Sequence, residues 1–221
     1  NKEWFKKNFP ADFVSEYMAQ VRTWFYYMHV LSVLLFDQAP FKNVVVTGTV
    51  LATDGTKMSK SRGNFPEPEK IFDLYGADAL RFYLMQSPLM RAEDLNFQEG
   101  SVKEVYRKVI MLLFNVHQFY ELHGAKNKIF DKPGKKHIID QWIVNKLNML
   151  IRDVNYALEN YDTVMACNEL ESFINDLSLW YVRRSRERFT GKSEQDRDDA
   201  IRTLSHVLMT VVKLLAPISP F

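Results

Sequence analysis

Residues 43–51 have the sequence Asn-Val-Val-Val-Thr-Gly-Thr-Val-Leu, and this stretch decides the fold class. It is rich in β-branched residues and almost continuously apolar, which is typical of an interior strand in a parallel sheet. Gly48 interrupts the pattern, and a glycine within a strand indicates close approach of backbone or ligand. The dipeptide Asp54-Gly55 then predicts a turn.

Helical patterns lie on both sides of this strand. Upstream, the dense apolar residues of 19–36 predict a buried helix, because the run is too long for an ordinary strand. Downstream, Pro68 can open a helix that ends near Gly76, and residues 77–87 repeat a helical pattern. Strands that alternate with helices indicate the end of a doubly wound, Rossmann-like α/β domain, which we assign to residues 1–95.

The pattern changes after Pro88. Ser101 and Glu104 have the spacing of a capping box, which predicts a helix start. Apolar residues then recur at helical spacing in four segments: 105–119, 143–158, 170–180 and 201–215. A four-helix bundle is the simplest way to bury four such stripes. We therefore expect α/β plus all-α architecture, with a soft boundary near 88–100 and a helical domain over 96–221.

Composition narrows the class of protein. Of the 221 residues, 47% are hydrophobic and 25% are charged, which favours a folded chain over a disordered one. The net charge of +2 shows no global basic field, so any RNA-binding surface must be local. The single cysteine, Cys167, excludes a disulfide framework and suits a reducing cytoplasm. No apolar run is long enough to span a bilayer, and we interpret both ends as cuts inside a longer protein.

The chemistry-bearing segment is Lys57-Met58-Ser59-Lys60-Ser61, between the predicted strand and the helix at Pro68. Two ammonium groups and two hydroxyls within five residues, flanked by Gly55 and Gly63, can wrap a polyphosphate. Open α/β sheets bind ligands in loops that follow a parallel strand. A solvated basic turn is the alternative, since short motifs often match by chance.

This loop, continued by Arg62-Gly63-Asn64, resembles the KMSKS signature of class I aminoacyl-tRNA synthetases. Four further segments resemble the isoleucine, valine and leucine subgroup, and the isoleucine enzymes in particular: YGADALR at 75–81, WYVRRSR at 180–186, LLAPISPF at 214–221 and QVRTWF at 20–25. The last of these is not usual in valine enzymes. The resemblance covers nearly the whole chain.

The resemblance implies roles for individual residues. Lys57 and Lys60 would stabilise charge on the β- and γ-phosphates of ATP while Ser59 and Ser61 shape the loop and contact phosphate. Further ATP-binding positions would be Met58, Gly48, Val50 and Leu51. Glu16 and Gln20 match positions near the aminoacyl-adenylate, and Trp24 matches a wall of the isoleucine pocket. For Trp24, ordinary helix core is the alternative that the apolar pattern favours.

Three departures from the family pattern weaken parts of this prediction. Tyr17 and Ala19 replace the usual Gly and Asp before Arg22, and that Asp is the expected partner of the adenylate ribose. Thr23 replaces another Gly and could crowd the pocket. The family's HIGH signature and its editing domain normally lie upstream of residue 1, so we expect this chain by itself to be inactive.

A dense arginine cluster follows Trp180 and Tyr181, and it comprises Arg183, Arg184, Arg186 and Arg188. On a helical wheel Arg184 and Arg188 share one flank. Arginines beside aromatic rings suit phosphate contact and base stacking in single-stranded RNA. The alternative is a solvated helix end paired with Glu187 and Glu171, and the residues alone leave both open.

These observations lead us to expect an isoleucine–tRNA ligase fragment. Its ligands would be isoleucine, tRNA-Ile and ATP with Mg²⁺, without a metal site in this chain. We expect the parent protein to be cytoplasmic and monomeric, with no membrane contact. A non-catalytic RNA-binding protein derived from a synthetase, or a valyl-tRNA synthetase, is the alternative.

Overall fold

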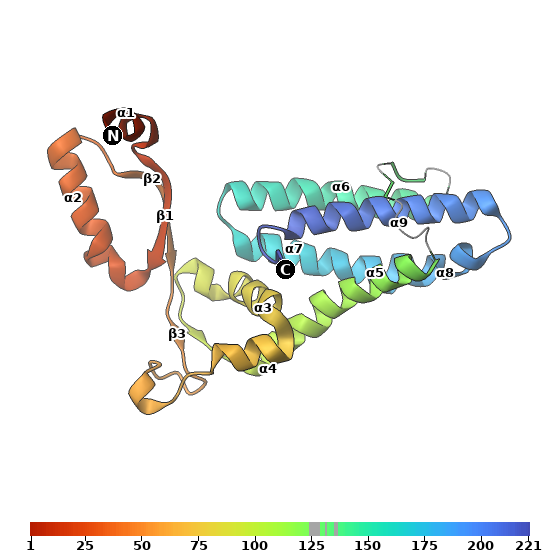
Figure 1. Cartoon of the computed structure of the whole chain (residues 1–221), viewed down its shortest axis with the longest axis horizontal. Coiled ribbons are helices and arrows are strands. Elements are labelled where there is room, and N and C mark those ends of the chain that lie inside the picture. Colours follow the sequence, from red (N-terminus) through yellow and green to blue (C-terminus); the bar gives the residue numbers. More distant parts are fainter. Residues whose placement is uncertain (124–128, 131, 135–136) are drawn as a thin grey trace. The chain divides into compact units, whose positions relative to one another are not determined.

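The computed structural model describes residues 1–123, 129–130, 132–134 and 137–221, and the chain divides into two compact units. The first unit comprises residues 1–65 and 87–98, and it contains the strands. The second comprises residues 66–86 and 99–221 and is helical in its described part (Figure 1). The expected class, an α/β portion followed by an all-α portion, is confirmed.

The first unit is built around a β-α-β arrangement. Strand β1 (Ala11–Tyr17) pairs in parallel with β2 (Phe41–Thr47), and helix α2 (Trp24–Phe36) lies between them in the chain. Two shorter strands, β3 (Val50–Leu51) and β4 (Leu95–Asn96), also pair in parallel. The predicted parallel strand is therefore present, but its interior placement was wrong. Among the described residues β2 pairs on one side only, and the stretch splits at Gly48.

Gly48 explains the split. Its N–H donates to the Leu89 carbonyl at 2.8 Å, so it leaves the ladder of β2 and joins the segment that precedes β4. A Cβ atom at this position would lie 1.9 Å from the Glu93 carbonyl oxygen, a distance that no side chain can occupy. The prediction that Gly48 marks a close approach is confirmed, and the approaching group is backbone.

The region predicted as a buried helix over 19–36 differs in two ways. Its first residues form a 3₁₀ turn, η1 (Met18–Arg22), and only then does α2 begin. Within α2 only Phe25 and Ser32 are buried, while Leu34 and Leu35 are 77% and 69% exposed. Phe25 packs edge-on against Phe41 of β2 at 5.9 Å between ring centroids. Because the helix is apolar on every side, contact with one neighbour leaves most of that surface uncovered.

Short elements complete the first unit: α1 (Lys2–Asn8), η2 (Lys60–Arg62) and η3 (Pro88–Arg91). Asn1 caps α1 by accepting hydrogen bonds from the Glu3 and Trp4 N–H groups. Phe5 stacks on Phe9 with ring centroids 4.7 Å apart, which gives this end of the unit a small aromatic cluster.

Helix α3 (Pro68–Gln86) opens the second unit, and it begins at Pro68 as predicted. Gly76 has φ 79° and ψ 158°, so the α3 ribbon is two helical segments joined by a break at this glycine. The sequence pattern predicted the same two segments.

The remaining elements are α4 (Glu99–Val105), η4 (Tyr106–Ile110), α5 (Met111–His123), α6 (Ile138–Glu159), α7 (Thr163–Asn175), η5 (Asp176–Val182), α8 (Arg183–Thr190) and α9 (Glu194–Leu215). Contiguous elements join into long rods over 99–123 and 163–190, which pack with α6 and α9 (Figure 1). The four-helix bundle is thus confirmed. The capping box was wrong, because α4 begins two residues earlier and places Ser101 inside the helix.

The core of the bundle follows three of the predicted stripes closely. Val109, Ile143, Leu147 and Leu204, from the stripes over 105–119, 143–158 and 201–215, have no solvent exposure. No helix among the described residues is long and apolar enough to cross a bilayer.

The stripe that was expected to continue from Leu177 to Trp180 shifts by one residue instead. Trp180 is 51% exposed, whereas Tyr181 is fully buried. The segment η5 is π-helical, with i→i+5 hydrogen bonds. Each such turn holds an extra residue, so the buried stripe after Leu177 continues through Tyr181, Ser185 and Phe189, and Val182 beside Tyr181 is buried as well.

Candidate functional site

The loop after β3 starts with a tight turn. The Ala52 N–H donates to the Thr56 carbonyl at 2.8 Å, and Gly55 takes φ 79° inside the turn. The Asp54 carboxylate accepts hydrogen bonds from the Thr56 hydroxyl and N–H, at 2.7 and 2.9 Å. These bonds lower the pKa of Asp54, so its carboxylate is ionised and holds the turn. The turn predicted at Asp54-Gly55 is confirmed.

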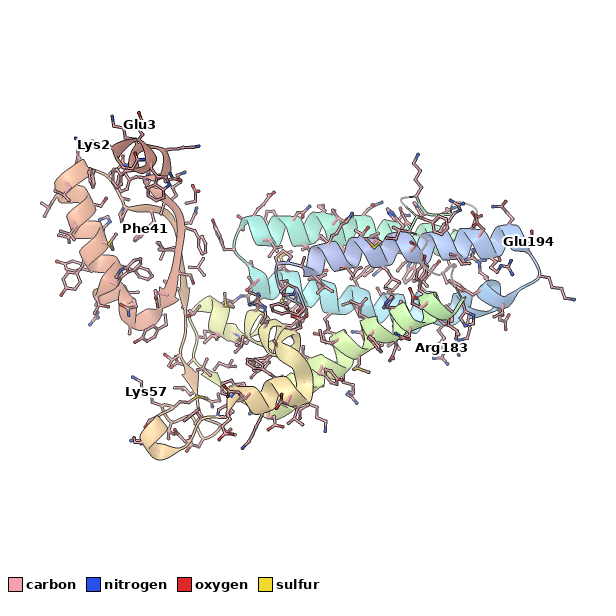
Figure 2. All side chains as sticks on the ribbon, viewed as in Figure 1. Lys2, Glu3, Phe41, Lys57, Arg183 and Glu194 are labelled. Carbon is pink, nitrogen blue, oxygen red and sulfur yellow. The ribbon has the colours of Figure 1, made fainter. Side chains whose placement is uncertain are left out.

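Lys57 lies where the turn closes. It forms an isolated antiparallel bridge with Leu51, while its side chain extends into solvent (Figure 2). The hydroxyl oxygens of Ser59 and Ser61 are 2.7 Å apart. Lys60 begins the short helix η2, and its side chain lies outside the described part of the structure.

The side chain of Asn64 orders this loop through three hydrogen bonds. Its Oδ1 accepts from the Ser59 N–H at 2.9 Å, and its Nδ2 donates to the Thr56 hydroxyl at 3.1 Å and to the Lys57 carbonyl at 3.2 Å. Gly63, with φ 60°, makes the reversal that brings Asn64 back to the loop. The sequence pattern did not assign this role, although a Gly-Asn pair directly after a polar loop is a usable signal for it.

The loop can therefore present an exposed ammonium and paired hydroxyls from a backbone that is already ordered. A loop of this kind needs little rearrangement when a polyphosphate binds, which is the requirement for electrostatic stabilisation of developing charge.

The residues expected near amino acid and adenine gather at one edge of the β1–β2 sheet. Tyr17 ends β1 opposite Thr47, which ends β2, so Glu16 and Gly48 lie at neighbouring carboxyl ends of parallel strands. Ligands of open α/β sheets bind outside this edge. Val50 and Leu51 follow in β3 and are half-buried.

Gln20 and Trp24 lie where η1 meets α2. The Gln20 side-chain oxygen accepts from the Thr23 hydroxyl at 2.6 Å and from the Trp24 N–H at 3.3 Å, so it caps the start of α2. Thr23, which replaces the family's usual glycine, thus has a polar partner. Trp24 is 43% exposed, so the alternative that made it ordinary helix core is wrong for this structure.

In the second unit, three members of the arginine cluster are exposed. The Arg184 guanidinium carbon lies 4.1 Å from the centroid of the Trp180 ring, and Arg186 lies 5.8 Å from that of Phe119. Arg183 precedes them at the start of α8 (Figure 2). These residues and Trp180 form an exposed surface that we call the arginine face: Trp180, Arg183, Arg184 and Arg186.

Arg188 and Tyr181 do not belong to that face. The Arg188 guanidinium donates to both carboxylate oxygens of Asp140 at 2.8–2.9 Å and to Asp196 at 2.9 Å, and its side chain is only 9% exposed. The Tyr181 hydroxyl donates to Asp140 at 2.8 Å. Neither side chain is accessible to RNA in this structure. The prediction that the four arginines lack enough acidic partners was therefore wrong for Arg188, which pairs with Asp140 and Asp196. The missed partner, Asp140, stands as an acid on the apolar stripe of Ile143 and Leu147, which is a signal in the sequence.

This buried network is electrostatically coherent. Burial tends to lower the Arg188 pKa, but hydrogen bonds to Asp140 and Asp196 raise it overall, so the guanidinium stays charged. The hydrogen bond from Arg188 lowers the pKa of Asp196. Burial, and then the neighbouring Asp140, raise the pKa of Tyr181, so its hydroxyl remains a donor. The network ties α6, η5, α8 and α9 together.

Two family models match the chain. Residues 1–96 match the family model for tRNA synthetases class I (I, L, M and V), and residues 140–221 match that for the anticodon-binding domain of tRNA ligase. The chain therefore belongs to the class I aminoacyl-tRNA synthetases.

Within that family, the chain is similar to curated isoleucine–tRNA ligases. The chain is 41% identical to that of Protochlamydia amoebophila over all of its length and 22% of the relative. It is 42% identical to that of Corynebacterium efficiens, again over all of its length and 21% of the relative, and 41% identical to the cytoplasmic enzyme of Schizosaccharomyces pombe over 99% of the chain and 22% of the relative. The chain thus spans about a fifth of the length of these relatives.

Solved structures of two other synthetases share the fold. A methionyl-tRNA synthetase of Mycobacterium tuberculosis in complex with methionyl-adenylate has a TM-score of 0.78 at 22% identity, over 99% of this chain and 44% of that one. The LeuRS of Agrobacterium radiobacter K84, in a ternary complex with tRNA and LeuAMS, has a TM-score of 0.70 at 22% identity, over 96% of this chain and 26% of that one.

Proposed function

We propose that the full-length protein is an isoleucine–tRNA ligase, in which this chain supplies the phosphate loop and part of the tRNA-binding surface. One observation carries the proposal: Asn64 orders the loop 57–61, which follows the parallel strands β2 and β3 in the chain, and the chain is about 42% identical to an isoleucine–tRNA ligase. We further propose a cytoplasmic, monomeric protein whose domains meet near residues 95 and 96, with the helical domain over 96–221.

The first step would join isoleucine to AMP. The isoleucine carboxylate attacks the α-phosphorus of MgATP, a P–O bond breaks, and pyrophosphate leaves while isoleucyl-adenylate forms. Lys57 and Lys60 would stabilise the negative charge that moves onto the leaving pyrophosphate, with Ser59 and Ser61 as hydroxyl donors. Glu16 and Gln20 would contact the adenylate, and Trp24 would cover the isoleucine side chain. Adenine would lie along Gly48, Val50 and Leu51, and Met58 would also contact ATP.

In the second step a terminal ribose hydroxyl of tRNA-Ile attacks the isoleucyl carbonyl, and AMP leaves. The arginine face is the surface of this chain that we assign to tRNA. Exposed arginines next to an aromatic ring suit phosphates and unstacked bases, and single-stranded RNA loops offer both.

Isoleucine-dependent pyrophosphate–ATP exchange by the full-length protein tests the proposal, with valine as the competing substrate. Lys60→Ala should slow activation by about 10²–10³-fold, because the charge it stabilises develops in the transition state. Both kcat and kcat/KM should fall. A change confined to the KM for ATP would contradict the role of Lys60.

Ala19 favours a second candidate, a synthetase-derived RNA binder without catalysis, because it removes the carboxylate expected at the adenylate ribose. Absence of exchange by the full-length protein, with tRNA binding retained, would support that candidate. We expect the 221-residue chain by itself to form no isoleucyl-adenylate.

A further inference from the structure

Thr23 uses its hydroxyl in an uncommon way. It directly precedes α2, where a threonine usually caps the helix by accepting hydrogen bonds from the first N–H groups. In this structure the side chain of Thr23 makes no such cap. Its hydroxyl oxygen lies 2.6 Å from Oε1 of Gln20 and 3.3 Å from the Ala19 carbonyl oxygen. The hydroxyl therefore points back into η1 instead of forward into the helix.

The backbone of α2 fixes which way the Gln20 amide faces. The oxygen and the nitrogen of a glutamine amide are told apart by their partners, because the nitrogen donates and the oxygen accepts. The Trp24 N–H is a donor at 3.3 Å from the amide, so the atom that faces it is Oε1. Thr23 then donates its hydroxyl proton to the same atom, since two oxygens 2.6 Å apart repel unless a proton lies between them.

This arrangement leaves Gln20 only donors to offer a ligand. Oε1 has two lone pairs, and Thr23 and Trp24 use one each. Among the described residues, Nε2 of Gln20 makes no hydrogen bond, and the residue is half-buried. The side chain can therefore bind an oxygen acceptor through Nε2, whereas a ligand ammonium group would find no acceptor on it.

The position of Gln20 places these donors at the ligand-binding edge of the sheet. Gln20 belongs to η1, which begins directly after Tyr17 at the carboxyl end of β1. Ligands of open α/β sheets bind outside this edge. A side chain whose orientation is set before the ligand arrives loses less conformational entropy on binding than a freely rotating one.

We propose that Thr23 is a positioning residue, which holds the Gln20 amide so that its N–H groups bind an oxygen atom of isoleucyl-adenylate. The inference rests on the proposed function and deepens it, because it assigns the direction of the Gln20 hydrogen bond and the residue that sets it. Glycine, the family's usual residue at position 23, has no hydroxyl with which to do this. Thr23 thus supports the ligand site, in contrast to the expectation that it could crowd the pocket.

Thr23 variants of the full-length protein test this role through isoleucine-dependent pyrophosphate–ATP exchange. Thr23→Val keeps the branched shape and removes the hydroxyl, so kcat/KM for isoleucine should fall about tenfold from lost positioning. Thr23→Ser keeps the hydroxyl and should stay within about twofold of the wild type. The matched control is Thr210→Val in α9, which removes a hydroxyl bond to the His206 carbonyl and should leave exchange unchanged.

Thr23→Gly separates positioning from crowding. It removes the hydroxyl and also creates space beside Gln20. If Thr23 positions Gln20, the glycine variant should be as slow as Thr23→Val. A glycine variant that is faster than the wild type would show crowding and overturn the proposal.

A double-variant cycle shows whether Thr23 acts through Gln20. In Gln20→Ala the hydroxyl has no amide to position, so adding Thr23→Val should slow exchange by less than about twofold more. Gln20→Glu keeps the size of the side chain but replaces the N–H donors by acceptors, and it should be at least as slow as Gln20→Ala. Multiplicative effects of the two changes would overturn the positioning role, and wild-type activity in Gln20→Glu would overturn the donor assignment.

Binding of a sulfamoyl analogue of isoleucyl-adenylate keeps this inference separate from the proposed function. Calorimetry with the full-length protein should show about tenfold weaker binding by Thr23→Val than by the wild type. Equal binding by the two, with exchange by the wild type intact, would overturn the inference alone. A wild type that binds the analogue without catalysing exchange would overturn the proposed function, and Thr23→Val would still decide the inference. A wild type that does neither would overturn both.

Discussion

Helices α2 and α6 show how differently apolar residues behave in the two units. Along α6, Ile143, Leu147 and Leu150 form one stripe, and each is buried against other helices of the bundle. Helix α2 is apolar on all sides, yet Leu34 and Leu35 remain mostly exposed. A periodic stripe states which side of a helix needs a partner. A uniformly apolar helix indicates that several of its sides need partners, and the described residues cover only one side of α2.

The largest expected effect is on the bundle. Asp140→Ala removes the carboxylate that Arg188 and Tyr181 share and leaves a buried guanidinium with Asp196 as its remaining acid. Breaking a buried pair from one side costs about 3–5 kcal/mol of unfolding free energy. Urea unfolding followed by far-UV circular dichroism measures it. Asp198→Ala, which removes an exposed i,i+4 pair with Arg202, should cost under about 1 kcal/mol. Equal costs would contradict the structural role of Asp140.

Gly48→Ala tests the first unit in the same way. The added methyl group meets the Glu93 carbonyl, so backbone must shift at a cost of about 1–3 kcal/mol. Hydrogen exchange at the Gly48 amide, which bonds to Leu89, should accelerate. The matched control is Gly100→Ala in α4, where nothing lies near the new methyl group, and there we expect about 0.5–1 kcal/mol of stabilisation.

Asn64→Ala should leave both units folded and disturb the loop. Three hydrogen bonds to residues 56–59 disappear, so Lys57 and Ser59 lose their fixed backbone. In the full-length enzyme we expect about a tenfold slower isoleucine activation, or roughly 1.4 kcal/mol, from lost positioning. Asn64→Asp keeps the acceptor for the Ser59 N–H, so its rate of isoleucine activation should lie between those of the wild type and Asn64→Ala. An unchanged kcat in Asn64→Ala would show that the loop is ordered without this side chain.

The smallest expected effect is the loss of stability at low pH that depends on Asp196. Because Arg188 lowers the folded pKa of Asp196, this carboxylate contributes stability above its ordinary pKa of about 3.9, and the contribution is lost as pH falls through the depressed value. The groups around it are Arg188, Asp140 and His137. Partial exposure keeps the effect under about 1 kcal/mol. Unfolding measured from pH 6 to 3 should show a shallower loss in Asp196→Asn than in wild type.

The sequence predicted a large part of this molecule because much of it depends on neighbours in the chain. The break at Gly76, the close approach at Gly48 and the turn at Asp54-Gly55 each follow from the conformational properties of one or two residues. The helical stripes follow from local spacing. The loop motif was evident as well, although the role of Asn64 within it was not.

The features that could not be predicted depend on contacts between residues far apart in the chain and on a change in helical periodicity. Arg188 pairs with Asp140, 48 residues earlier, and a helical wheel of residues 180–188 does not include that partner. The wheel also assumes one period throughout, whereas η5 holds an extra residue and moves the buried position from Trp180 to Tyr181. The same two causes explain why Arg184 and Arg188, which share a flank on the wheel, have opposite surroundings.

The π-helical segment makes the rod over 163–190 sensitive to chain length in a particular way. Deleting Ser178 would shorten η5 by one residue and allow a continuous α-helix. Because each residue turns an α-helix by about 100°, everything after the deletion would rotate by that angle relative to α6. Arg188 would leave Asp140, and the arginines would face a new direction. The extra residue in η5 thus determines the rotation of α8 about its own axis. Its removal would change which way the side chains of α8 point more than it would change the length of the rod.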